Sequence, residues 1–281
     1  MPKIGAHVSV AGGLYKAIEN AKKIGAETIQ IFGSSPRQWS VKMPDNKEVL
    51  LFKEKLKNSN IGPLFIHAPY LVNIATPDDE IRKKSINNLI GQMKIAELIS
   101  ADGVIFHIGT KKDLSEKEAL EKCSDAIKII LKKVPGKSKL IIENNAGEGN
   151  KVGTTPREIG KIIKQVNSSR MGACIDTAHS LGAGIIKDYT REKIKIFFDD
   201  WEKNIGEEKI SALHINDSKA PADSHRDRHE NIGLGYIGLK GFKNLAKEKR
   251  ANKLPWIIEV PGFDKKGPDR KNIKLLKSLF K

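Results

Sequence analysis

The sequence predicts an α/β fold in which residues 1–281 form one domain, a closed (β/α)₈ barrel of parallel strands. Three observations predict it. Eight short apolar or β-branched runs recur along the chain, and amphipathic stretches with helical spacing separate them. Six consecutive runs also carry a polar residue at their carboxyl end. Continuous apolar runs are typical of strands buried on both faces, as in a parallel sheet.

The expected strands are short, and each is followed by enough chain for one crossover helix. From the third strand onward, the residues that mark the strand ends lie 33 to 45 residues apart. Between the first two strands, Leu14, Ala17, Ile18 and Ala21 repeat at helical spacing. The eight strands are expected at residues 4–8, 28–32, 64–67, 103–107, 140–143, 172–176, 212–215 and 256–259.

An open, doubly wound sheet is the alternative to the barrel. Eight βα units of this length fit closure better than an open sheet. No Gly-x-Gly-x-x-Gly follows the first strand, and residues 11–13 (Ala-Gly-Gly) are typical of a turn. No low-complexity segment or interdomain linker interrupts the pattern, and segments such as 135–137 and 261–263 have the length of ordinary connections.

The composition indicates a folded chain with a basic surface. It is 39% hydrophobic and 30% charged, and 50 Lys and Arg against 34 Asp and Glu give a net charge of +16. That charge favours a polyanionic partner, although lysine-rich helix surfaces are also common elsewhere. No apolar run approaches eighteen residues, and the start lacks the apolar stretch of a signal peptide, so we expect a cytoplasmic protein without a membrane partner. Cys123 and Cys174 are expected to be buried free thiols.

Polar residues at the ends of six consecutive strands are the most informative feature of the sequence. A single such histidine is usually a satisfied core or rim residue, but in a barrel six equivalent positions converge on the carboxyl-end mouth. Each residue type among them can bind a metal ion. The six are His67, His107, Glu143, Asp176, His214 and Glu259.

Two further clusters follow strand ends and extend this set. His179 lies three residues after Asp176, and Asp227 and His229 occupy alternate positions of a later loop. The nine candidate ligands offer nitrogen and oxygen but no thiolate, which suits zinc or manganese. Nine groups exceed the needs of one tetrahedral ion, so we expect two or three ions that share a bridging carboxylate.

Three functions are compatible with these residues. A metal cluster with an open position activates water and stabilises both oxygens of a phosphoryl displacement, so a basic chain favours phosphodiester hydrolysis. A metal-dependent sugar isomerase or epimerase uses a similar barrel mouth, but would need few basic residues around it. A nucleic-acid-binding protein could instead use closed zinc sites only to stabilise its fold.

The chain closely resembles the endonuclease IV family of abasic-site nucleases along nearly its whole length. The resemblance lies in segments 3–9 (KIGAHVS), 142–144 (IEN), 174–179 (CIDTAH), 214–219 (HINDSK), 227–229 (DRH), 232–235 (IGLG) and 258–261 (IEVP). It implies a TIM barrel with three zinc ions. The implied ligand sets are His67, His107 and Glu143; Glu143, Asp176, His214 and Glu259; and His179, Asp227 and His229.

The resemblance also implies the reaction and its substrate. Duplex DNA would be cut at the phosphodiester 5′ to an abasic site, giving a 3′-hydroxyl and a 5′-deoxyribose phosphate. Trimming of blocked 3′ termini is a secondary expectation, manganese is an alternative ion in one site, and nothing demands more than a monomer. Glu143, Glu259 and His107 are the candidate catalytic residues.

Further residues are expected to handle the DNA. An abasic nucleotide has to leave the helix to reach buried metals, and a wedge should fill the gap. The resemblance assigns Arg37, Tyr70 and Leu71 to this task. The chain departs from the family at Glu148, where glutamine is usual, and that carboxylate could alter metal affinity or DNA contact. Ala178, which replaces the common cysteine, is expected to matter little.

Two histidines near the expected mouth have no implied ligand role. His7 is expected to hydrogen-bond to a ligand, and His225 is expected to lie on the surface.

Overall fold

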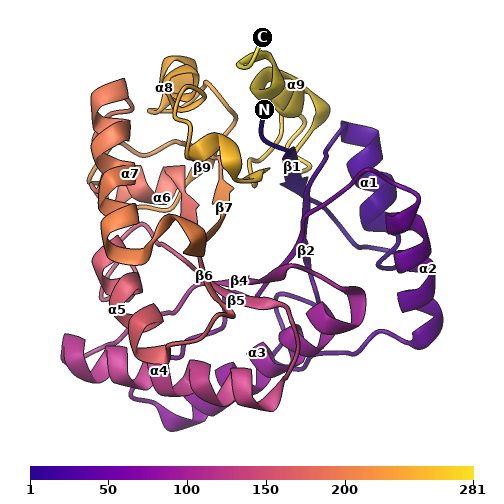
Figure 1. Cartoon of the computed structure of the whole chain (residues 1–281), viewed down its shortest axis with the longest axis vertical. Coiled ribbons are helices and arrows are strands. Elements are labelled where there is room, and N and C mark those ends of the chain that lie inside the picture. Colours follow the sequence, from indigo (N-terminus) through magenta and orange to yellow (C-terminus); the bar gives the residue numbers. More distant parts are fainter.

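The computed structural model describes all 281 residues, and it shows a closed parallel barrel surrounded by helices (Figure 1). The strand order around the barrel is β1-β10-β7-β6-β5-β4-β3-β2, so the first and last barrel strands pair and close it. The predicted (β/α)₈ fold is therefore confirmed. The barrel strands are β1 (Ile4–His7), β2 (Ile29–Phe32), β3 (Leu64–His67), β4 (Gly103–Phe106), β5 (Lys139–Glu143), β6 (Met171–Asp176), β7 (Ile210–His214) and β10 (Trp256–Ile258).

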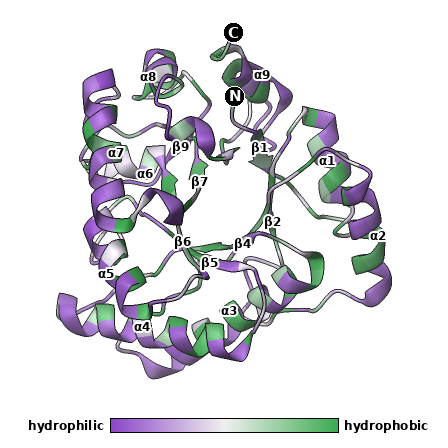
Figure 2. Cartoon of the chain, in the orientation of Figure 1, coloured by the Kyte–Doolittle hydropathy of each residue, from purple (hydrophilic) through white to green (hydrophobic).

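Helices form the outer layer and turn their apolar faces toward the strands (Figure 2). Their starts follow local sequence rules: Ser115 with Glu118 forms a capping box in front of α4 (Glu116–Lys133), and Thr155 with Glu158 forms one in front of α5 (Pro156–Val166). None of the helices combines the length and the apolar character that a membrane-spanning segment needs. The helices are α1 (Lys16–Ile24), α2 (Asn46–Lys57), α3 (Asp79–Ile99), α4 (Glu116–Lys133), α5 (Pro156–Val166), α6 (Thr177–Gly182), α7 (Arg191–Ile205), α8 (Gly238–Leu245) and α9 (Arg270–Ser278), with short 3₁₀ turns at Glu207–Lys209 and Ala251–Lys253.

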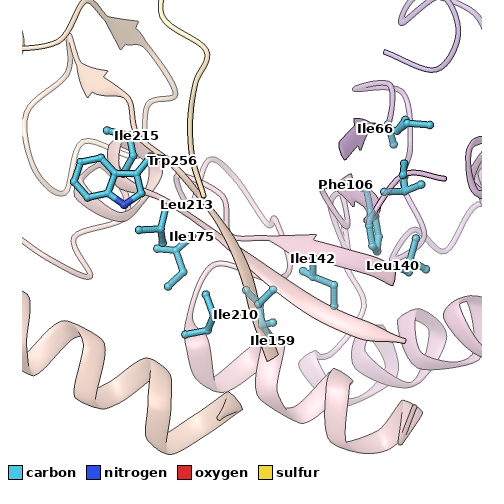
Figure 3. Close-up of a cluster of buried hydrophobic side chains, with 14 of the residues drawn as sticks. Ile66, Phe106, Leu140, Ile142, Ile159, Ile175, Ile210, Leu213, Ile215 and Trp256 are labelled. Atoms are coloured by element: carbon cyan, nitrogen blue, oxygen red, sulfur yellow. The ribbon is translucent and has the colours of Figure 1, made fainter. Parts of the chain in front are cut away.

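Alternating strand residues build two separate apolar cores. The larger one lies between barrel and helices and includes Ile66, Phe106, Leu140 and Ile142, which Figure 3 shows on neighbouring strands. The smaller one lies inside the barrel, because successive strand residues point to opposite faces. It consists of Phe65, Ile105, Ile141, Cys174, Ala212 and Ile257.

The strand period also explains how the polar layer arises. Each of the six strand-end residues named above lies two positions after a member of the inner apolar core, and therefore points into the barrel as well. The barrel interior is thus apolar below and polar at the carboxyl-end mouth. Both cysteines are buried and free, as expected, and Cys174 belongs to the apolar layer.

The ends of the strands differ from the prediction by one or two residues. His107 and Glu259 lie one residue past the ends of β4 and β10 rather than inside them. The structure also contains a small antiparallel hairpin that was not predicted, β8 (Asp217–Ser218) with β9 (His229–Glu230). Its strands are too short to show a hydrophobic period. The hairpin brings His229 back over the barrel mouth.

Candidate metal centre

The nine candidate ligands gather in one place at the mouth of the barrel. Eight of them fall into three groups in which all potential ligand atoms lie within 4.8 Å of one another. Glu143 belongs to two of these groups and Asp176 to two, so the groups form one connected cluster. The groups are His67, His107 and Glu143; Glu143, Asp176, His214 and Glu259; and Asp176, His179 and His229.

Glu143 lies at the centre of the cluster. Its carboxylate is fully buried, with Oε2 3.0 Å from Nε2 of His67 and 3.4 Å from Nε2 of His107. Its Oε1 lies 2.9 Å from Nδ1 of His214 and 3.2 Å from Nδ1 of His179. One carboxylate therefore faces four imidazoles from four separate segments of the chain, which is the position that a bridging ligand requires.

Asp227, the ninth candidate ligand, lies beside His179 and His229, although the compact group that contains these two histidines does not include it. Its Oδ1 lies 3.2 Å from Nε2 of His179 and 3.3 Å from Nε2 of His229. Asp176 stands in its place within that group, at 3.8 Å from His229. All nine residues that the sequence singled out are thus brought together. His179 lies near both Glu143 and Asp227, and Asp176 belongs to two of the groups.

The side chain of Glu148 contacts the backbone of the loop that carries Asp227. Its Oε1 accepts a hydrogen bond from the Asp227 amide at 2.8 Å, and Lys151 Nζ donates to its Oε2 at 2.8 Å. The carboxylate therefore ties the loop that carries Asp227 to the loop after β5. Its charge is offset by Lys151, which stabilises the carboxylate at this position.

Electrostatics in the cluster favour positive charge. Burial opposes a charge on Glu143, but His214 and His107 outweigh it and hold the pKa of this carboxyl well below its usual range. Burial likewise opposes protonation of His179, yet Asp176 and Asp227 hold its pKa well above the usual value. Burial lowers the pKa of His107 to about 4, so this imidazole is neutral at pH 7. Bound cations would supply the charge that these carboxylates need.

The donor set fits divalent metal ions with nitrogen and oxygen ligands. Two imidazole nitrogens in the cluster, Nε2 of His179 and Nε2 of His229, are buried and make no hydrogen bond, although Asp227 Oδ1 lies 3.2 and 3.3 Å from them. Buried polar atoms are rarely left unpaired, so such nitrogens indicate a ligand. Imidazole and carboxylate together suit zinc and also manganese.

Buried amides support the ligands, and the sequence interpretation missed them. Asn144 accepts from the Asp176 amide at 2.7 Å, and Asn216 donates to Asp176 Oδ2 at 2.6 Å. Asn216 also accepts from the Glu259 amide at 2.7 Å. Their signal is position: each asparagine follows a strand-end ligand by one or two residues. Gln30, in the middle of β2, is a third amide in this layer.

The residues expected to handle DNA lie around the mouth. Tyr70 is 72% exposed and Leu71 is 37% exposed, both directly after β3. The Tyr70 ring lies 6.0 Å from the His67 ring, which places it beside the cluster. Arg37 is exposed on the loop after β2.

The two remaining histidines lie where they were expected. His7 Nδ1 lies 3.3 Å from Glu259 Oε1 and the side chain is mostly buried. His225 is exposed and pairs with Asp223 at 3.4 Å. His7 therefore supports a candidate ligand, and His225 is a surface residue.

Comparisons with known proteins agree with this architecture. Residues 18–279 match the family described as "Xylose isomerase-like TIM barrel". The chain is 37% identical over 281 residues to "Probable endonuclease 4" of Aquifex aeolicus, covering 100% of this chain and 98% of the relative. It is 36% identical over 276 residues to "Probable endonuclease 4" of Halothermothrix orenii, and this match covers 98% of this chain and 99% of the relative.

A solved structure gives the same result. The crystal structure of endonuclease IV from Thermus thermophilus is 28% identical, with a TM-score of 0.84, and the match covers 99% of this chain and 98% of that one. The sequence comparison and the fold comparison thus both match proteins named endonuclease 4 or endonuclease IV, over nearly the full length of each. The chain belongs to the endonuclease IV family of TIM-barrel enzymes.

Proposed function

We propose that this chain hydrolyses the phosphodiester 5′ to an abasic site in duplex DNA, leaving a 3′-hydroxyl and a 5′-deoxyribose phosphate. The observation that carries the proposal is the connected cluster of three donor groups that share Glu143 and Asp176. The net charge of +16 suits a polyanionic substrate, and the relatives named endonuclease 4 support a nuclease.

Three zinc ions would occupy the cluster. The proposed ligands are His67, His107 and Glu143 for the first ion; Glu143, Asp176, His214 and Glu259 for the second; and His179, Asp227 and His229 for the third. When bound, the ions would lower the pKa of water and offset the charge that develops on the phosphate oxygens. Manganese is an alternative in one site.

Of the three candidate catalytic residues, the two carboxylates are charged at pH 7 and the imidazole is neutral, and each would have a different role. Glu143 is fully buried and its lowered pKa keeps it ionised between the donor groups. His107 stays neutral at pH 7, so its imidazole can act as a ligand or acceptor. The Glu259 carboxylate is 16% exposed, and its pKa is also held well below the usual range, so it stays ionised and can accept a hydrogen bond from the attacking water.

The rim would select the abasic nucleotide. Tyr70 offers an exposed ring beside the cluster and Leu71 an exposed aliphatic side chain, so they can fill the space that an extruded nucleotide leaves. Arg37 on the neighbouring loop can contact the opposite strand or its phosphates. The same hydrolysis at a blocked 3′ end gives the proposed 3′-phosphodiesterase activity. All nine proposed ligands come from one chain, so we propose a monomer and a single domain.

The proposal is tested by a metal count combined with an incision assay. Protein purified without chelator is expected to hold about three zinc ions per chain and to cut a duplex with one tetrahydrofuran site, while an intact duplex stays uncut. A sugar isomerase or epimerase would leave both duplexes intact and convert a sugar instead. A protein with purely structural zinc would bind the abasic duplex without cutting it. Either result would overturn the proposal.

Replacing Tyr70 by alanine is expected to weaken binding of abasic duplex by about 10- to 100-fold, because loss of one stacking side chain costs roughly 1–3 kcal/mol. Fluorescence anisotropy with a tetrahydrofuran duplex measures this. Tyr236 offers a matched control, since it is also exposed (63%) but lies on the loop after β9. Equal losses in Tyr70→Ala and Tyr236→Ala would show that the effect is not specific to the proposed wedge.

A further inference from the structure

Gln30 is a buried amide at the centre of a strand that contributes none of the candidate ligands. It is fully buried in β2, between Ile29 and Ile31, which are fully buried too. An amide without hydrogen-bond partners at such a position would destabilise the fold. Its partners therefore explain why a polar residue occupies it.

The amide of Gln30 joins two of the candidate ligands. Its Nε2 donates to Oε1 of Glu259 at 2.6 Å, and its Oε1 accepts from Nε2 of His214 at 2.8 Å. Nε2 also lies 2.9 Å from Nδ1 of His7. One side chain thus contacts three residues from three strands or strand ends at the mouth.

These contacts determine which way the amide faces. A carboxylate only accepts hydrogen bonds, so the NH₂ end of Gln30 has to face Glu259. The oxygen end then faces His214 Nε2, and because that oxygen only accepts, the imidazole has to carry a hydrogen on Nε2. The neutral form of His214 therefore has its lone pair on Nδ1, which lies 2.9 Å from Glu143 and 3.2 Å from Glu259.

We propose that Gln30 is a positioning residue for the metal centre: it selects the tautomer of His214 and orients the Glu259 carboxylate, so that Nδ1 and Oε2 face the same ion. The inference rests on the proposed metal-binding function of these two residues. Partners of this kind orient metal ligands, and their loss typically lowers metal affinity about 10- to 100-fold.

The decisive variant is Gln30→Met, which keeps length and volume but has no comparable donor or acceptor. We expect zinc affinity, measured by chelator competition, to fall about 10- to 100-fold at one site, with kcat reduced and KM for abasic duplex nearly unchanged. Gln92→Met is the matched control, because Gln92 is also fully buried but lies in α3, where it donates to Ser34. It should keep wild-type zinc affinity.

A measurement on the unmodified protein covers the case in which Gln30→Met does not fold. Long-range ¹H–¹⁵N spectra of the zinc-loaded wild type should show the His214 proton on Nε2. A proton on Nδ1 would overturn the inference, as would unchanged zinc affinity in a folded Gln30→Met protein. Wild-type protein that holds no zinc would instead refute the proposed function itself, so the two failures are distinguishable.

Discussion

Replacing Glu143 by glutamine is expected to reduce incision of a tetrahydrofuran duplex by at least roughly 10³-fold, since activated water depends on the metals. The substitution keeps the shape of the side chain but removes the charge that four imidazoles face within 2.9–3.4 Å. An amide cannot bridge two cations as a carboxylate does. We expect the metal count to fall together with the activity.

Glu121→Gln is the matched control for this experiment. Glu121 is exposed on α4, outside the cluster, and should retain both zinc and activity. Circular dichroism should show an intact barrel for both variants, because the two apolar cores do not include residue 143. Incision by folded Glu143→Gln at the wild-type rate would contradict the proposed centre.

Zinc is expected to raise the melting temperature more at pH 8 than at pH 6. Without metal, the pKa values of His179 and His214 are raised on folding, so their contribution to stability is present below about 6.5 and is lost as the pH rises through the raised values. Zinc binds the deprotonated imidazoles and replaces the charge of the lost protons. The metal-dependent part of stability therefore grows over the window in which the proton-dependent part disappears.

The carboxylates of the cluster have the opposite effect on stability: their contribution is lost as the pH falls. The pKa values of Glu143, Glu259 and Asp227 are lowered, so their contribution is present above the usual carboxyl range and is lost as the pH falls through the lowered values. Burial lowers the pKa of His107 to about 4, which adds a further loss of stability as the pH falls from about 6.5 toward 4, so metal-free protein should be most stable near pH 6.5. Acid and base should each lower its melting temperature.

The size of the zinc effect follows from binding linkage. A ligand at 1,000 times its Kd stabilises the folded state by about 4 kcal/mol per site. For a chain of this size that corresponds to roughly 10 °C per site. Differential scanning calorimetry with and without chelator at several pH values measures it. His225→Gln, which changes an exposed histidine, should leave the pH profile unchanged. A zinc effect that shrinks between pH 6 and 8 would refute this account.

Much of the candidate site could be predicted because the strand period connects sequence and geometry. In β3 and β5, an inward-facing apolar residue precedes the inward-facing polar one by two positions, as Phe65 precedes His67 and Ile141 precedes Glu143. A run that ends in His or Glu therefore identifies a residue that points into the barrel. The convergence of six such residues then follows from barrel closure alone.

The supporting amides could not be predicted in the same way. Gln30 interrupts an apolar run as a single polar residue. Its sequence neighbours do not indicate whether its amide is buried with hydrogen-bond partners or exposed at the edge of a sheet. Its partners, His214 and Glu259, lie 184 and 229 residues away. Only the closure of β2, β1, β10 and β7 into neighbouring positions brings them together.

By itself, the sequence determined the barrel, the direction of the six strand-end side chains and the chemical character of the mouth, because each depends on local periodicity and residue type. The tertiary structure decided that Glu143 faces four imidazoles, that Asp176 belongs to two donor groups, and that the hairpin returns His229 to the cluster. Those relations depend on distances between residues remote in the chain. Such distances are set by barrel closure and by the paths of loops that have no period.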